Sequence, residues 1–497
     1  MRLFGDGTRR VGQGLLLAVA MAMPVSAAMP STAMAVVNPD DVLAGKTFAE
    51  RGIDAGMAPD IMAPRATLID TEGNVYFQRH DTEECKIAST TKIMTALVAI
   101  EQGNPEQFVT VTDRDTVIGS TANLMAGDTL TLDDALHGLL LPSGNDAAMA
   151  IARSVGAQFA PAGQDPYDAF VARMNARAQE MGLQNTLFVN PSGLDYEEWN
   201  GPHHSTAADL AKLATEAMKN EQFRKIVATK NYVIHPYNNN VPRDVALEST
   251  NLLLGTNEGI LGVKTGQTDQ AGSCFVGAWE YDGKTYISVI LGEQSKEVAF
   301  AETTVLFQWV VNHEHTYQLG ENDGTTTDDG RPIIAEIPHT DWIDVLVPLT
   351  VKDPAEKTHA FDLNGEVKQT AHLETAKGDI HAGDVLGAIE LKQGDEVIDS
   401  IDLIAAEDVP APSWLRSVFI AIDRFFRNIT GQPIEAETKG HFPESGNGSP
   451  AGNKSGDNGT GSGQQGTGGS GSPSSSGSSG SASTTGSSSS GGTTASS

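Results

Sequence analysis

A long C-terminal segment of this chain has no large apolar side chain. From Ser445 to Ser497 the sequence is nearly all Gly, Ser, Thr, Asn and Gln, and Lys454 and Asp457 are its only charged residues. Such a segment has nothing to bury and remains a flexible coil in water. We therefore predict a disordered Gly/Ser-rich tail over 440–497, which serves as a spacer or a solubilising tail, and a folded part that lies before it.

The N-terminus has the composition of an export signal. Three arginines precede a short apolar run at residues 14–23, and small residues follow at 25–27 and 33–35. This order of basic, apolar and small residues is typical of a cleaved secretory signal. An uncleaved membrane anchor is the alternative, but the apolar run is only about half as long as a comfortable bilayer span. We therefore expect residues 1–35 to be a signal peptide and the protein to be exported.

Charge and composition argue against several classes of protein. The chain of 497 residues has 33 Lys and Arg against 64 Asp and Glu, a formal net charge of −31, so it lacks the basic surface that a nucleic acid requires. Its two cysteines cannot form a disulfide framework or a multi-cysteine metal site. No uninterrupted apolar run of about 18 residues exists, which excludes a polytopic membrane protein. We expect no nucleic acid, metal or cofactor, and the sequence does not indicate an oligomeric state.

Residues 40–315 combine helical and strand patterns, which predicts an α+β domain. Strand-like segments flank turn sequences at 72–73 and 282–283, as in β-hairpins. Apolar residues recur with helical spacing over 87–102 and over 132–152, where a proline interrupts the second helix.

The pattern changes to short strands over 330–408, which predicts a small β-rich domain without evident chemistry of its own. A Pro-Ala-Pro sequence follows, and after it residues 413–430 have the spacing of an amphipathic helix. One face of this helix carries three arginines. The other face is apolar and consists of Trp414, Leu415, Val418, Phe419, Ile422, Phe425, Phe426 and Ile429.

This helix has two interpretations. Aromatic rings beside arginines suit the headgroup region of an anionic membrane, where the helix would lie on the surface without spanning it. The alternative is a helix packed against a neighbouring domain. Its position between a proline-rich break and the Gly/Ser-rich tail favours a membrane surface as the partner of residues 414–429.

Ser89 and Lys92 are the first candidate catalytic residues. They lie three residues apart at the start of a predicted helix, so they share one face. A serine hydroxyl is a weak nucleophile at neutral pH and needs an adjacent base. A lysine can be that base if burial or a nearby cation lowers its pKa. Alone, an S-x-x-K motif is weak evidence, because exposed helices often contain it.

Two further motifs strengthen the case. The sequence S-G-N at 143–145 lies on the break inside the second predicted helix, where polar side chains can face a cleft. The sequence K-T-G at 264–266 precedes a strand pair, and Gly266 leaves room for a substrate backbone beside the strand. Lys264 adds a cation that can lower the pKa of Lys92 and attract a carboxylate. The motifs S-x-x-K, S-x-N and K-T-G in this order are typical of serine enzymes that react with penicillin.

The sequence closely resembles the D-alanyl-D-alanine carboxypeptidases, the low-molecular-mass penicillin-binding proteins of bacterial cell walls. The resemblance runs from about Ala63 to Leu403 and is carried by the segments 87–95, 143–148, 190–194, 204–211 and 264–269. It implies an α+β catalytic domain of the penicillin-binding/β-lactamase-like type, with an antiparallel sheet flanked by helices. A small β-rich domain and an amphipathic membrane helix would follow it.

The resemblance also implies a reaction. Ser89 would attack the carbonyl between the two terminal D-alanines of a peptidoglycan stem pentapeptide, with Lys92 as general base. Ser143 would pass a proton to the leaving amine, and water would then hydrolyse the acyl-enzyme. β-Lactam antibiotics would acylate Ser89 and leave slowly. Such an enzyme would act at the outer face of the cytoplasmic membrane and in the cell wall.

The substrate-binding residues implied by the resemblance surround these groups. Lys264 and Thr265 would hold the terminal carboxylate, and Asn145 would orient Lys92 and bind the peptide chain. The backbone N–H groups of the nucleophile and of Gln267 would form an oxyanion hole. The predicted set is Asn145, Lys264, Thr265, Gly266 and Gln267.

One position departs from the family pattern. The family often has an arginine after the K-T-G strands, where this chain has Ala299. The nearest cation in the sequence is Lys296. We therefore expect carboxylate binding to depend on Lys264 and Thr265, or to include Lys296.

The remaining histidine and cysteine residues have simpler interpretations. No third ligand at zinc spacing accompanies His203 and His204, so we interpret His204 as structural. Cys85 and Cys274 border the predicted site, where they could pair in an exported protein or remain buried thiols.

Two other functions fit the sequence less well than a carboxypeptidase does. A class A β-lactamase would need a glutamate that positions the deacylating water, and no E-x-x-L-N segment occurs between the second and third motifs. A scaffold that binds peptidoglycan without reacting would not need the intact set of Ser, Lys, Ser, Asn and Lys.

Overall fold

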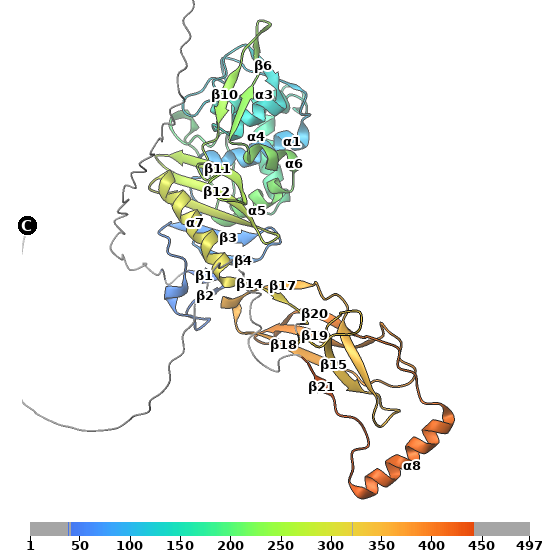
Figure 1. Cartoon of the computed structure of the whole chain (residues 1–497). Helices are drawn as coiled ribbons and strands as arrows, with labels where there is room; N and C mark the ends of the chain where they lie inside the picture. Colours follow the sequence, from blue (N-terminus) through green and yellow to red (C-terminus); the bar gives the residue numbers. More distant parts are fainter. Residues whose placement is uncertain (1–37, 39–40, 321, 442–497) are drawn as a thin grey trace, which may run out of the picture. The chain divides into compact units, whose positions relative to one another are not determined.

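The computed structural model describes residues 38, 41–320 and 322–441 (Figure 1). The predicted signal peptide lies outside these residues, and so does the predicted tail except for its first two residues. Gly440 and His441 are structured, because Gly440 belongs to a short strand. The structured part of the chain therefore extends slightly beyond the predicted start of the tail.

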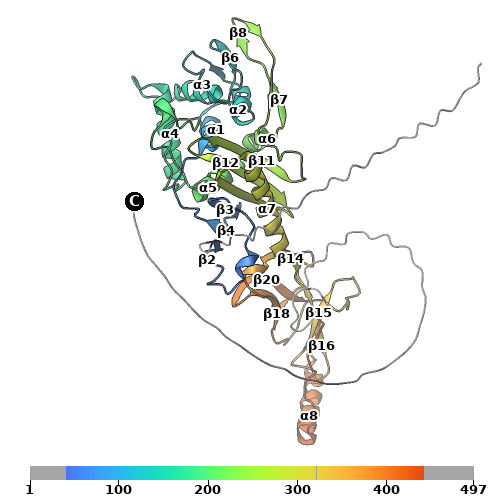
Figure 2. The same cartoon turned by 90° about the vertical axis from the view of Figure 1, so that its left-hand side faces the viewer.

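The region that contains the three sequence motifs is built on an antiparallel sheet of seven strands, in the order β11-β12-β13-β3-β4-β1-β2. Strands β11, β12, β3, β4 and β2 of this sheet are labelled in Figure 2. The turns predicted at 72–73 and 282–283 join β3 to β4 and β12 to β13, so both hairpins are confirmed. Strand β11, which carries the K-T-G sequence, lies at one edge. The strands are β1 Val42–Leu43, β2 Lys46–Thr47, β3 Arg65–Asp70, β4 Val75–Arg79, β11 Ile260–Thr268, β12 Gly272–Tyr281 and β13 Lys284–Glu293.

Side chains alternate between the two faces of this sheet, and helices cover both. On β12, Val276 joins the large core that includes α5 (Ala207–Met218). The preceding Phe275 faces α7 (Lys296–His313), where its ring lies 4.8 Å from that of Phe300. This alternation is the period-two pattern of a strand buried on both faces. The predicted antiparallel sheet flanked by helices is confirmed.

A helical region covers the sheet on the side of α5. The predicted helix over 132–152 is two helices, α2 (Leu132–Leu140) and α3 (Asn145–Gly156), which are separated at the proline as expected. The predicted helix over 87–102 begins as a 3-10 turn, η2 (Ala88–Thr91), and continues as α1 (Lys92–Gln102). The other elements are η1 Ala55–Met57, α4 Pro166–Glu180, η3 Glu197–Trp199, α6 Glu221–Val227, β5 Phe108–Thr110, β6 Asp128–Thr131, β7 Asn231–Ile234, β8 Tyr237–Asn238, β9 Val241–Pro242 and β10 Val245–Glu248.

The second folded region is rich in β-structure, as predicted. Its main sheet has the order β18-β19-β20-β16-β15-β21, and β14 pairs with β17 beside it. A separate apolar core lies within this region. The elements are β14 Glu314–Gln318, β15 Ile333–Pro338, β16 Leu346–Val351, β17 Lys357–Phe361, η4 Asp362–Asn364, β18 Val367–Leu373, β19 Val385–Gln393, β20 Glu396–Ala405 and β21 Lys439–Gly440.

The predicted amphipathic helix is α8 (Trp414–Thr430), which ends at Gly431 in the left-handed conformation. After α8 the chain returns to the β-rich region, where β21 pairs with β15. Within the described residues, no helix is both long and apolar enough to cross a bilayer. Both ends of α8 are thus connected to the β-rich region.

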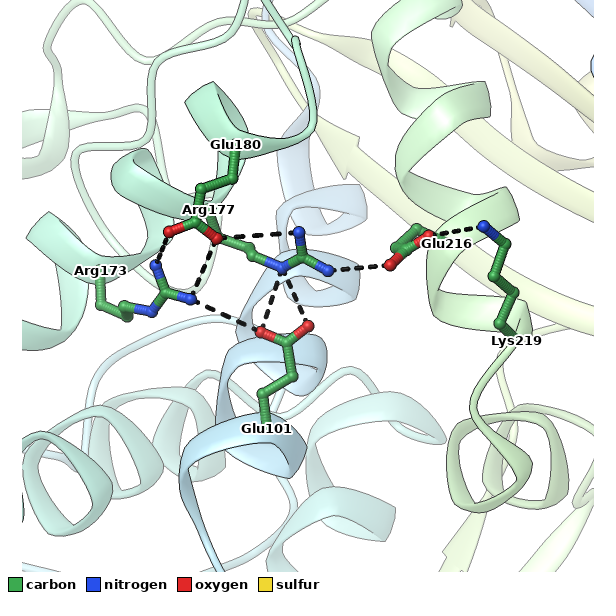
Figure 3. Close-up of polar contacts among 6 residues, drawn as sticks. All are labelled: Glu101, Arg173, Arg177, Glu180, Glu216 and Lys219. Atoms are coloured by element: carbon green, nitrogen blue, oxygen red, sulfur yellow. Dashed lines mark hydrogen bonds and ion pairs between the residues drawn. The ribbon is translucent and has the colours of Figure 1, made fainter.

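A network of ion pairs joins three helices of the region that contains the three motifs (Figure 3). Arg177 on α4 is at its centre and lies 2.9 Å from both Glu101 on α1 and Glu216 on α5. Arg173 and Glu180 extend the network along α4, at 2.6 Å from each other. Charged groups that are shared in this way are held more firmly than isolated surface pairs.

We predict that Arg177→Met lowers the free energy of unfolding by about 1–2 kcal/mol, because two carboxylates lose a shared charged donor. Urea unfolding followed by circular dichroism measures this change, and the loss should shrink at high salt. The matched control is Lys225→Met, which removes the exposed pair with Glu221 at 2.6 Å and should leave the urea midpoint unchanged. Equal midpoints for wild type and Arg177→Met would show that the network adds no stability.

Candidate active site

The serine of the first motif lies on the 3-10 turn that precedes α1. Ala88, the residue before Ser89, has a φ of +46°, an uncommon conformation for a residue with a side chain. The Thr91 hydroxyl donates to the Ala88 carbonyl oxygen at 2.8 Å and lies 2.7 Å from Nε2 of His203. The Val189 N–H donates to Nδ1 of His203, so Nε2 carries the ring proton and donates to Thr91. These bonds hold the turn that presents Ser89.

Lys92 is completely buried directly behind this serine. Its Nζ lies 2.8 Å from Oγ of Ser89, 2.8 Å from Oδ1 of Asn145 and 2.7 Å from the carbonyl oxygen of Ser192. Burial holds the pKa of Lys92 well below its ordinary value, the charge of Lys264 lowers the pKa further, and Asp146 opposes both effects. An amine in this position is within reach of the serine proton and favours its neutral form.

The second motif lies on the break between α2 and α3, where Asn145 is the first residue of α3. Oδ1 of Asn145 faces Lys92, and its Nδ2 donates to the carbonyl oxygen of Ile118 at 3.0 Å. Ser143 has a φ of +66°. Its Oγ is buried and makes no hydrogen bond within the described part of the chain, so it is free to bond a reacting group.

The third motif lies on the edge strand β11. Lys264 is buried, its Nζ donates to the Thr265 carbonyl oxygen at 2.9 Å, and burial together with the charge of Lys296 lowers its pKa to about 7. The Thr265 hydroxyl lies 2.6 Å from that of Thr250. A side chain at Gly266 would place its Cβ 3.0 Å from the backbone nitrogen of Ser89, so glycine allows β11 to lie against the turn that carries Ser89.

The structure thus brings the three predicted motifs into one site. Ser89, Lys92 and Asn145 are connected by hydrogen bonds, Gly266 adjoins Ser89, and the charge of Lys264 acts on Lys92. Gln267 follows on β11 and is exposed. Ala299 is buried in the apolar core around α7, whereas Lys296, at the start of that helix, is partly exposed.

Some groups at the site were not identified from the sequence. The carbonyl oxygen of Ser192 accepts a hydrogen bond from Lys92. A Cβ at Gly193 would lie only 1.8 Å from the Ala88 carbonyl oxygen, so the loop at 190–194 lies directly against the turn that carries Ser89. The resemblance had pointed to this loop without giving it a role. Of the two adjacent histidines, His203 is buried and contacts Thr91, whereas His204 bonds the carbonyl oxygen of Pro202 near the surface.

The two cysteines are free thiols in this structure. Burial raises the pKa of Cys85 to about 11 and that of Cys274 to about 12. Both thiols are therefore protonated and weakly reactive at neutral pH.

Comparisons with known proteins agree with this geometry. A family model described as D-alanyl-D-alanine carboxypeptidase (Peptidase_S11) matches residues 54–295. The D-alanyl-D-alanine carboxypeptidase of Streptomyces sp. strain K15 is 33% identical over 288 residues, which cover 56% of this chain and 97% of that protein. DacF of Bacillus subtilis strain 168, a D-alanyl-D-alanine carboxypeptidase, is 28% identical over 362 residues, or 71% of this chain and 87% of that protein.

Among solved structures, the Streptomyces K15 DD-transpeptidase superimposes with a TM-score of 0.48 at 33% identity, covering 50% of this chain and 97% of that one. The sequence relatives and the family model carry the assignment. They match the part of the chain that contains all three motifs, and the Streptomyces protein is covered almost from end to end. The chain belongs to the D-alanyl-D-alanine carboxypeptidase family of serine peptidases.

Proposed function

We propose that this chain is a serine-type D-alanyl-D-alanine carboxypeptidase that removes the terminal D-alanine of peptidoglycan pentapeptides through an acyl-enzyme on Ser89. The observation that carries the proposal is the 2.8 Å distance from Lys92 Nζ to Ser89 Oγ in a site where burial lowers the pKa of the lysine. A buried amine of lowered pKa is the base that a serine nucleophile lacks.

In the first step, neutral Lys92 takes the Ser89 proton while Oγ bonds to the carbonyl carbon of the penultimate D-alanine. The carbonyl oxygen becomes negative and is bound by the backbone N–H groups of Ser89 and Gln267. The Ser143 hydroxyl, which has no other partner in the described residues, gives its proton to the leaving nitrogen and takes up the proton that Lys92 removed from Ser89. The C–N bond breaks, free D-alanine leaves, and water then hydrolyses the ester to restore Ser89.

β-Lactam antibiotics fit the same sequence of steps. Their strained amide carbonyl would occupy the position of the scissile carbonyl and acylate Ser89. The cleaved ring stays attached to the acyl group, so no leaving group departs and water has less access to the ester. We therefore expect a long-lived covalent adduct at Ser89.

We predict that Ser89→Ala abolishes covalent labelling by a fluorescent penicillin and release of D-alanine from a synthetic pentapeptide. Lys92→Ala should lower both rates by about 10²–10⁴-fold, the usual contribution of a general base. Mass spectrometry of the peptide products measures the reaction, since loss of one alanine identifies the bond. The control is Lys212→Ala, at an exposed lysine of α5, which should react normally. Near-normal release by Lys92→Ala would remove its assigned role.

The terminal carboxylate of the substrate would be bound by Lys264 and Thr265, with Lys296 as an additional cation. Lys296 makes no ion pair within the described residues, and its charge reaches Lys264. A cation in the first turn of a helix is unfavourable with respect to the helix dipole, so helix stability does not explain this residue. Attraction of a carboxylate to the site does explain it.

We predict that Lys296→Ala raises KM for the pentapeptide roughly fivefold with little change in kcat, as the loss of one partly exposed charge pair would. Steady-state kinetics on the free-acid and C-terminally amidated pentapeptides test this. The amidated peptide lacks the carboxylate, so wild type and variant should handle it equally. An equal KM for the free acid would show that Lys296 takes no part in recognition.

A lipid surface is the proposed partner of α8. Its eight large apolar side chains are each 50–75% exposed. Two of the three arginines contact the β-rich region: Arg424 donates to the carbonyl oxygens of Thr340 and Trp342 at 2.6 and 2.7 Å, and Arg416 lies over the Trp342 ring. Arg427 pairs with Asp423 on the same helix. With Arg416 and Arg424 bound to the protein, the apolar face is left for the headgroup–acyl boundary of a membrane. The proposed export signal would deliver the enzyme to the outer face of that membrane.

We predict that Phe419→Gln combined with Phe425→Gln releases the protein from anionic phospholipid vesicles in a co-sedimentation assay while peptide hydrolysis in solution is kept. Removing α8 by truncation is a poorer test, since it would also remove β21. The matched control is Phe108→Gln, because Phe108 on β5 is 66% exposed, as Phe419 is, but lies on another element. If the double variant still sediments with vesicles, α8 is not the membrane-binding element.

A further inference from the structure

The amide of Asn145 must face a particular way for Lys92 to be held. Its Oδ1 accepts from Lys92 at 2.8 Å, and a flipped amide would place an NH2 group against the lysine instead. The orientation is set on the other side, where Nδ2 donates to the Ile118 carbonyl oxygen at 3.0 Å. The Asn145 N–H also donates to the Ser120 carbonyl oxygen, at 2.8 Å. Residues 118–124, here called the 118–124 loop, therefore determine which way this amide faces.

The 118–124 loop has no regular structure of its own, and one carboxylate accepts several hydrogen bonds from it. Asp146, which is only 2% exposed, accepts from the Thr121 hydroxyl at 2.6 Å and from the N–H groups of Ala122 and Leu124 at 2.9 and 3.0 Å. It also accepts from the N–H of Ala147, at 2.8 Å, in the first turn of α3. Asp146 forms no ion pair with any residue that the structure describes. A buried carboxylate without a cation is costly unless several donors surround it, and the 118–124 loop supplies most of them.

We propose that Asp146 is a positioning residue of the reaction, which holds the 118–124 loop so that Ile118 fixes the Asn145 amide with its oxygen toward Lys92. This inference rests on the proposed roles of Lys92 and Asn145. Asp146 touches neither the nucleophile nor a substrate atom, and it acts through Asn145. The packing around Asp146 is tight, because a Cβ at Gly144 would lie 2.6 Å from Oδ1 of Asp146 and 2.8 Å from the nitrogen of Ala122.

Asp146 also has an electrostatic effect on the general base. Two charged groups act on Lys92, and they have opposite signs: Lys264 on β11 lowers the pKa of Lys92 and Asp146 on α3 raises it. Lys92 acts as a base in its neutral form, so acylation rises with pH through the pKa of Lys92. Removing the negative charge of Asp146 lowers that pKa further. The acid limb of the rate profile should then move to lower pH.

The test measures the second-order rate of penicillin acylation of the full chain against pH, for wild type and four variants. Asp146→Asn should lower the plateau by about tenfold and move the acid limb to lower pH. In an Asn145→Ala background, the same substitution should change the plateau by less than about twofold, because its effect passes through Asn145. Thr121→Val, which keeps the charge, should lower the plateau by about threefold without moving the limb.

The matched control is Asp209→Asn. Asp209 is another buried carboxylate that holds a loop, accepting from the N–H of Asn185 at 2.9 Å and the Thr186 hydroxyl at 2.8 Å, away from Lys92. It should reproduce any loss of thermal stability and leave the pH profile unchanged. An unmoved acid limb in Asp146→Asn, or an equal loss with and without Asn145, would overturn the proposal. Failure of wild type to label at Ser89 would instead remove the underlying reaction.

Discussion

The burial of two lysine side chains, Lys92 and Lys264, determines how the rest of this site is arranged. Lys92 and Lys264 are at most 1% exposed, and neither forms an ion pair with a described residue. Burial without a neutralising carboxylate penalises the charged forms, which is why both have lowered pKa values. The fold compensates with neutral acceptors, chiefly the carbonyl oxygens of Ser192 and Thr265 and the amide oxygen of Asn145. Burial of this kind favours the neutral form of an amine beside a serine.

The site requires several backbone segments to approach one another closely, without side chains between them. Gly266 allows the edge strand β11 to lie against the turn that carries Ser89, and Gly193 allows a second loop to lie against the same turn. The 118–124 loop closes another side through its bonds to Asn145 and Asp146. Each close approach joins segments that are distant in sequence. The sheet and its helices therefore serve chiefly to hold these segments in place around Ser89 and Lys92.

Much of this could be predicted from the sequence, because local patterns determine local structure. The hairpins followed from their turn residues, the break between α2 and α3 from its proline, and the motif order indicated which serine and lysines would meet. The lysine–serine spacing required only that a helix begin near Ser89, as α1 does. The supporting groups could not be found in this way. The Ser192 carbonyl and most of the donors to Asp146 are backbone groups, which the residue type does not reveal. The role of His203 depends on its contact with Thr91, which is distant in the sequence.

We expect Lys92 to be a neutral amine at neutral pH because it is buried beside a second lysine. The most direct measurement is the pKa of Lys92 itself, obtained by NMR titration of a protein labelled at the lysine Cε carbons and assigned with Lys92→Arg. We expect the pKa of Lys92 to lie far below the value of about 10.4 that exposed lysines have, and to rise when Lys264 is replaced by methionine. If Lys92 titrates together with the exposed lysines, burial beside Lys264 does not make it a neutral base.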